Sequence, residues 1–120
     1  MKPTEAAQHV CWSDLPAESV LPGVIRQRLD TQHMTVVRYR YEPGATFPAH
    51  SHPEEQVVLV LSGEIEFTVA ERPVQAAAGS VLVIPPHAVH SARVLSDVPV
   101  ATINVLSPRR TQQVTFAASG

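Results

Sequence analysis

Proline and glycine interrupt this chain so often that long helices are excluded. Eleven prolines and five glycines lie among 120 residues, about one in every eight positions. Proline removes a backbone donor and glycine favours turns, so breaks at this frequency predict short strands joined by turns. The length fits a single domain, and 44% apolar residues are enough for one core and argue against disorder.

The segments between these breaks have the two-residue period of strands. From Met34 to Tyr41, aromatic and aliphatic residues alternate with arginines, which is typical of a half-buried strand. Residues 56–61 are almost continuously apolar, which predicts a strand buried on both faces. Residues 65–69 alternate again after Gly63, so we expect a hairpin there. Further strand-like segments cover 81–84, 87–95 and 100–106. The predicted fold class is all-β, with one helical turn at most near 13–18.

Several classes of protein are excluded by charge and composition. The net charge of −2 and the absence of a basic stripe argue against a nucleic-acid partner. Cys11 is the only cysteine, so no internal disulfide can form. The first ten residues lack the apolar segment of a signal peptide, and no stretch approaches the ~20 apolar residues of a membrane span. We therefore expect no membrane association and a cytoplasmic location.

The histidines suggest a metal site. His50 and His52 are two residues apart in an extended segment, where they share one face and can approach a single ion. Gln56 has the same parity, and His90 follows Pro85-Pro86 at a strand entrance, from which it could reach the ion across a barrel. Three imidazoles and one oxygen suit Fe, Ni, Mn, Cu or Zn better than calcium or magnesium. The alternative is that these histidines fill the barrel interior without a metal.

A wider spacing joins these residues into two known motifs. The first motif of the cupin family matches Gly44, His50, His52, Gln56 and Gly63, with glutamine in place of the usual glutamate, and the second matches Gly79, Pro85 and His90. The chain therefore resembles a small single-domain cupin over residues 34–106. This resemblance implies a double-stranded β-helix, the jelly-roll barrel, with a metal ion bound by His50, His52, Gln56 and His90. His87 and Val94 depart from the second motif, which has glycine and asparagine there.

Within this family, the chain is similar to the pectin-degradation cupins, which ketonise unsaturated uronates. The similarity covers residues 50–63 and 104–110. It implies that Asn104, Leu106 and Arg110 line a substrate pocket, where those cupins have aspartate, phenylalanine and arginine. Arg110 and Asn104 are thus the candidate catalytic residues, but an amide cannot abstract a proton as a carboxylate can. A basic residue after Ser-Pro at a strand end is also typical of a solvated position.

Other polar and aromatic residues have simpler interpretations. Glu54 and Glu55 precede a buried strand, and we expect both to be solvated. We expect His87 at the pocket rim or in solvent. His9 and His33 lie in polar surroundings typical of the surface. We expect three aromatic residues in the core rather than stacked on a substrate: Tyr39, Tyr41 and Phe67.

Two classes of function remain open. The first is a metal-dependent enzyme acting on a small polar or sugar-acid molecule, either an isomerase or lyase that uses the ion as a Lewis acid or an Fe(II)-dependent dioxygenase. The second is a non-catalytic cupin that binds a metal or small ligand. The absence of a fused regulatory domain favours the enzyme.

The expected organisation is an N-terminal arm (1–23), a barrel (24–110) and a C-terminal tail (111–120). The arm and Val24–Leu29 could pair with a sheet edge of a neighbouring copy, which predicts a homodimer.

Overall fold

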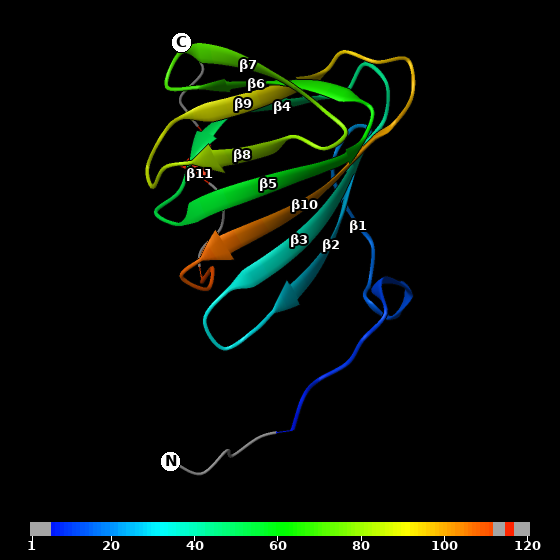
Figure 1. Cartoon of the computed structure of the whole chain (residues 1–120), viewed down its shortest axis with the longest axis vertical. Helices are drawn as coiled ribbons and strands as arrows, with labels where there is room; N and C mark the ends of the chain where they lie inside the picture. Colours follow the sequence, from blue (N-terminus) through cyan, green and yellow to red (C-terminus); the bar gives the residue numbers. More distant parts are fainter. Residues whose placement is uncertain (1–5, 112–114, 117–120) are drawn as a thin grey trace.

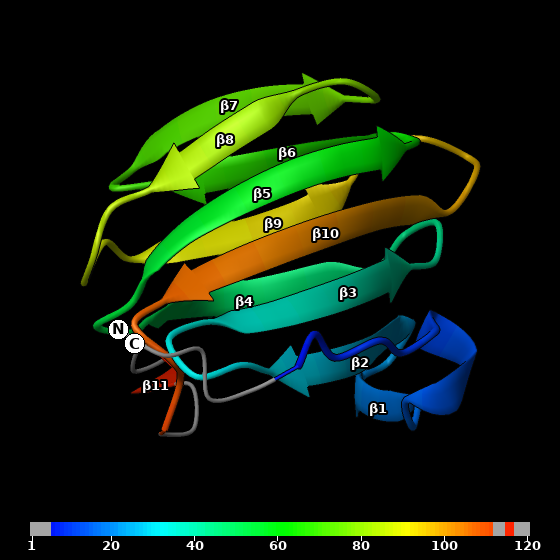
Figure 2. The same ribbon diagram turned by 60° about the horizontal axis from the view of Figure 1, so that its bottom comes forward.

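Two antiparallel β-sheets face each other in the computed structural model, which describes residues 6–111 and 115–116 (Figures 1 and 2). The elements in chain order are η1 (Trp12–Asp14), β1 (Glu18–Leu21), β2 (Val24–Asp30), β3 (Thr35–Tyr41), β4 (Thr46–Ser51), β5 (Glu55–Ser62), β6 (Glu64–Val69), β7 (Arg72–Ala77), β8 (Val81–Ile84), β9 (His90–Val94), β10 (Val100–Ser107) and β11 (Thr115–Phe116). The single 3-10 turn η1 is the only helix among the described residues. The predicted all-β jelly roll is confirmed.

The strand order follows the jelly-roll pattern, in which consecutive strands often lie in opposite sheets. One sheet has the order β1-β2-β3-β10-β5-β8, and the other has the order β11-β4-β9-β6-β7. Figure 2 shows these two layers packed face to face. No helix in the described part of the chain is long and apolar enough to cross a membrane. The cytoplasmic location stays a prediction.

Alternation along the strands places the core between the two layers. On β3, Val37, Tyr39 and Tyr41 are buried and Arg40 is exposed, as the two-residue period predicts. Tyr41 pairs with Val24 of β2 and with Val100 of β10. The hydrophobic core therefore lies between the inner faces of the two sheets.

The prediction of a hairpin at Gly63, between β5 and β6, is wrong. β5 pairs with β8 and β10, whereas β6 pairs with β7 and β9, so the chain crosses between the sheets at Gly63. Gly63 has a φ of 74° and lies against Val100 and Pro99, which leaves no space for a side chain at this corner. The hairpin forms one strand later, between β6 and β7, through Ala70 and Glu71, which both have positive φ.

The expectation that residues 56–61 are buried on both faces is also wrong. Val58 and Val60 point into the core, but Leu59 is only half-buried and Leu61 is 54% exposed. The reason is that a single layer covers this sheet, so the outer face of β5 stays open despite its apolar sequence. The exposed valines of the neighbouring edge strand β8 extend this apolar surface.

The N-terminal segment is partly built into the sheet. β1 pairs with β2, and Gln27 Nε2 donates hydrogen bonds to the carbonyl oxygens of Trp12 and Leu15. Residues 6–11 extend away from the two sheets (Figure 1). Because Val24–Leu29 lies between β1 and β3, this strand cannot offer its edge to a neighbouring copy as we expected. The division at residues 23 and 110 stays a prediction.

The corner at Gly63 gives a direct test of the fold. A Cβ at this position would lie 2.7 Å from Val100 Cγ2 and 2.8 Å from Pro99 O, whereas a Cβ at Gly79 would meet nothing within 4 Å. Both glycines have positive φ, so Gly79→Ala is a matched control that carries only the backbone strain, about 1–2 kcal/mol. Gly63→Ala should lower the free energy of unfolding by a further ~1–3 kcal/mol in urea titrations. Equal losses in the two variants would contradict the packed corner.

Candidate metal centre

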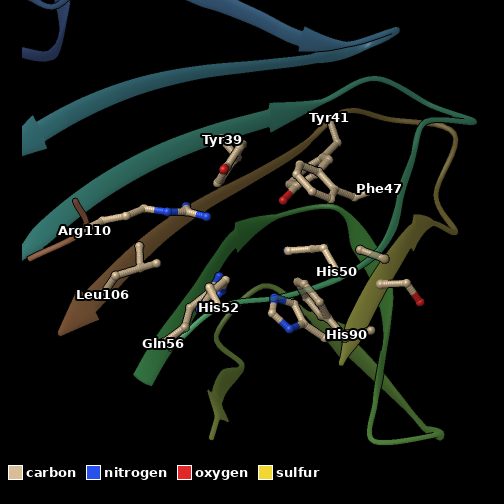
Figure 3. Close-up of a pocket in the computed structure, with 12 residues that line it drawn as sticks. Tyr39, Tyr41, Phe47, His50, His52, Gln56, His90, Leu106 and Arg110 are labelled. Atoms are coloured by element: carbon tan, nitrogen blue, oxygen red, sulfur yellow. The ribbon is translucent and has the colours of Figure 1, made fainter. Parts of the chain in front are cut away.

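Three buried imidazoles meet on the inner face of the five-stranded sheet. His50 is on β4, His52 follows that strand directly, and His90 begins β9. His50 and His90 are direct partners in the antiparallel pairing of β4 with β9. One ring nitrogen from each histidine lies within 4.8 Å of one from each of the others. Figure 3 shows the three rings converging.

Backbone carbonyl groups fix the orientation of all three rings. The Nδ1 atoms of His50, His52 and His90 lie 2.9, 3.1 and 2.9 Å from the carbonyl oxygens of Pro48, Glu54 and Ala88. A carbonyl oxygen can only accept, so each Nδ1 carries the proton. In this tautomer Nε2 is the unprotonated nitrogen of each ring, and an unprotonated imidazole nitrogen can bind a metal.

Burial keeps these rings neutral. Burial and the neighbouring His90 lower the pKa of His50 to about 3. Burial likewise lowers the pKa of His90 to about 4 and shifts the pKa of His52 in the same direction. Neutral imidazole is the form that donates to a metal.

The position of Gln56 also fits a bound cation. Its Oε1 lies 3.0 Å from His52 Nε2, while the Glu54 carbonyl occupies Nδ1 on the other side of the ring. A neutral imidazole has one N–H, so His52 cannot donate to both oxygens. A cation in contact with both Nε2 and Oε1 would remove this conflict, because each atom would then present a lone pair to the ion. His90 Nε2, which is buried without a hydrogen-bond partner, supplies a further donor.

The three-histidine cluster can therefore hold a divalent transition metal ion. Nitrogen donors with one amide oxygen suit Fe, Ni, Mn, Cu or Zn, and the choice among them stays open. The full set of His50, His52, Gln56 and His90 stays a prediction, since a bound ion would be needed to establish it.

Arg110 extends into the pocket beside this cluster. It follows β10, is only 6% exposed, and lines the pocket together with Tyr39, Phe47 and Leu106. Figure 3 shows its guanidinium between Tyr39 and His52. Its Nη2 atom is buried and has no hydrogen-bond partner. The alternative of a solvated Arg110 is therefore wrong.

The expectation that Glu54 is solvated is also wrong. Glu54 is 4% exposed, and its Oε1 lies 3.6 Å from Arg110 Nε and 3.8 Å from His52 Nδ1. The opposite charge of Arg110 compensates its burial, and because that partner is distant in sequence no local pattern indicated the contact. Glu55 is exposed, as expected.

Asn104 lies behind Gln56 and is not among the described residues that line the pocket. It is 1% exposed, and its Oδ1 accepts a hydrogen bond from Gln56 Nε2 at 2.9 Å. Its Nδ2 donates to Thr102 Oγ1 and to the Val37 carbonyl oxygen. The contact between Asn104 and Gln56 joins positions 48 residues apart, so no local sequence pattern indicates it.

The remaining candidates lie where the sequence placed them. His87 is exposed with a φ of 67°, and its backbone N–H donates to the His52 carbonyl oxygen. His9 and His33 are exposed. Tyr39, Tyr41 and Phe67 belong to the core and also form part of the pocket wall.

Comparison with known proteins identifies the family. The model of the cupin domain matches residues 37–106. This chain is a cupin. No curated protein matches it. Among solved structures, the cupin fold superposes on KdgF from Halomonas sp. (24% identity, TM-score 0.80, 88% of this chain and 96% of that chain). It also superposes on an RmlC-like cupin from Shewanella frigidimarina (25% identity, TM-score 0.78, 88% and 94%). A third match is the polyketide cyclase RemF from Streptomyces resistomycificus (18% identity, TM-score 0.79, 96% and 88%).

The assignment of the second motif can be tested with two histidines three positions apart. His90→Ala removes an inward-facing ring nitrogen, so the affinity for Co²⁺ should fall by well over tenfold. His87→Ala is the matched control, because that side chain is exposed and should leave affinity unchanged. Each variant is treated with a chelator and reconstituted with Co²⁺, and its metal content is then measured. Equal loss in the two variants would contradict the assigned site.

Proposed function

We propose that this cupin is an enzyme that uses a divalent transition metal ion as a Lewis acid on a small carboxylate, of the sugar-acid type. The observation that carries the proposal is the position of Arg110. Its buried, unpartnered Nη2 and the histidine cluster line the same pocket. A buried guanidinium nitrogen without a hydrogen-bond partner is suited to bind a carboxylate, to which it can donate a charge-assisted hydrogen bond.

The side chains of the pocket would have two separate roles, metal binding and carboxylate binding. His50, His52, Gln56 and His90 would hold the ion, which would polarise an oxygen of the substrate. Arg110 binds the carboxylate and orients the substrate. The ion pair with Glu54 occupies the Nε side of Arg110 and leaves Nη2 for the ligand.

Apolar groups form much of the remaining pocket wall. Phe47 and Leu106 are buried there, and the ring of Phe47 lies 4.7 Å from that of His50. An apolar wall of this kind strengthens the electrostatic interactions of a bound anion.

The resemblance to the pectin-degradation cupins makes unsaturated uronates the first substrates to test. These molecules combine a carboxylate with ring oxygens, which matches an arginine beside a metal site. Asn104 contacts Gln56 rather than the pocket, so we do not assign it the proton transfer. An Fe(II)-dependent dioxygenase and a non-catalytic binding protein would use the same donors and are separated by experiment.

A substrate screen tests the enzyme directly. The protein is loaded in turn with Fe, Ni, Mn, Cu or Zn and incubated with 4,5-unsaturated uronates and other small carboxylates. Loss of the substrate double bond without oxygen consumption would support the isomerase. Turnover only with iron and oxygen would identify the dioxygenase. Binding without turnover for every metal would contradict an enzyme.

Arg110→Gln tests carboxylate recognition. Loss of a charge-assisted hydrogen bond, worth about 1.5–3 kcal/mol, should lower kcat/KM roughly 10- to 100-fold while metal content stays the same. Arg93→Gln is the matched control, because Arg93 is an exposed arginine that pairs with Glu66 outside the pocket. Unchanged kcat/KM in Arg110→Gln would contradict this role.

We also propose a homodimer formed through β8. This strand is the edge of the six-stranded sheet, and Val81 and Val83 on it are 65% and 55% exposed. Edge strands are usually protected by charged residues, whereas this one is apolar. A second copy of β8 would supply both the missing backbone partners and an apolar cover, in a self-complementary contact.

Light scattering should give twice the chain mass of 13.0 kDa. Val81→Asp combined with Val83→Asp should give the monomer mass. Val98→Asp, at an exposed loop position, is the control and should remain dimeric. A monomeric wild-type protein would contradict the proposal.

A further inference from the structure

A chain of buried hydrogen bonds connects the backbone of β3 to the proposed metal site. Asn104 Nδ2 donates to the Val37 carbonyl oxygen at 3.3 Å and to Thr102 Oγ1 at 2.9 Å. Gln56 Nε2 donates to Asn104 Oδ1 at 2.9 Å, and Gln56 Oε1 lies 3.0 Å from His52 Nε2. Both amide side chains are buried, so water does not compete for these contacts.

The direction of every bond in this chain follows from its first member. The Val37 carbonyl oxygen can only accept, so the NH₂ group of Asn104 must face it. The Oδ1 atom of Asn104 therefore faces Gln56, which must present its own NH₂ group in return. As a result, the Oε1 atom of Gln56 is the one that faces the histidines.

We propose that Asn104 is a positioning residue that fixes the amide of Gln56 so that its oxygen is directed at the metal. The inference rests on the proposed metal site and adds a role for a side chain that does not reach the pocket. Without Asn104, the amide of Gln56 could turn over and present an NH₂ group, which cannot bind a cation.

The same chain of hydrogen bonds shows that glutamine at position 56 is compatible with asparagine at position 104. Glutamate at position 56 would bring a carboxylate oxygen to face Asn104 Oδ1, and both atoms are acceptors. Asn104 would have to turn over to relieve this, which would place its oxygen against the Val37 carbonyl. Glutamine at 56 and asparagine at 104 are therefore a matched pair of neutral side chains.

Two variants with the same number of heavy side-chain atoms as asparagine separate positioning from packing. Asn104→Asp keeps an acceptor for Gln56 Nε2 but sets its second oxygen against the Val37 carbonyl, so it should lower stability, whereas Asn104→Leu offers Gln56 no acceptor. The affinity for Co²⁺ should fall roughly 10- to 100-fold in Asn104→Leu and by less in Asn104→Asp. The visible spectrum of the Co²⁺-loaded Asn104→Leu protein should shift toward that of Gln56→Ala, because both lose the oxygen donor.

Controls keep the outcomes distinct. Ile65→Ala removes buried core volume on β6, in the sheet opposite Gln56 and Asn104, so it should lower stability and leave both Co²⁺ affinity and spectrum unchanged. If Asn104→Leu does not fold, Asn104→Ser replaces it, since serine is too short to reach Gln56. Wild-type Co²⁺ affinity and spectrum in Asn104→Leu or Asn104→Ser would overturn the role of Asn104. A wild-type protein that binds no Co²⁺ would instead refute the metal site itself.

Discussion

The pairing of β4 with β9 is the constraint on which the site depends. It sets His50 directly opposite His90, forty positions later in the chain. The pairing shifts register between Phe47 and His50, so the ladder is irregular just where the imidazoles begin. A slip of one residue would turn His90 to the opposite face of the sheet. The histidine cluster therefore depends on strand register as well as on local sequence.

Strand register places the three histidines together, and hydrogen bonds to backbone carbonyl oxygens orient their rings. Each histidine of the cluster has Nδ1 against a carbonyl oxygen two residues away, before it for His50 and His90 and after it for His52. Such short-range bonds cost little conformational entropy, because the partner is fixed by the same turn or strand. They turn the Nε2 side of each ring toward the other two rings of the cluster. A rigid set of donors binds a metal without the cost of ordering loops.

The sequence predicted the fold class and the histidine cluster because both depend on regular spacing. The alternation of apolar and polar residues predicted the buried face of β3, and the motif positions predicted the cluster of His50, His52 and His90. The features that the sequence did not predict depend on contacts between distant segments. Glu54 is buried because Arg110 returns beside it, and the chain changes sheets at Gly63 because Val100 packs there. Neither Arg110 nor Val100 is close enough in sequence to its contact for a local pattern to indicate it.

Charge balance links the metal donors to the proposed ligand. The four proposed donors are neutral, and the ion pair of Glu54 with Arg110 has no net charge. A divalent ion in this pocket would therefore keep its full double charge beside a partly apolar wall. Burying an uncompensated charge is costly, and a bound anion is the available compensation. Since Arg110 Nη2 also lacks a partner, a carboxylate would complete both the charge and the hydrogen bonding of the pocket. Because the proposed donors are neutral, the charge of the ion would be balanced by the ligand rather than by the protein. This favours anionic ligands over neutral ones.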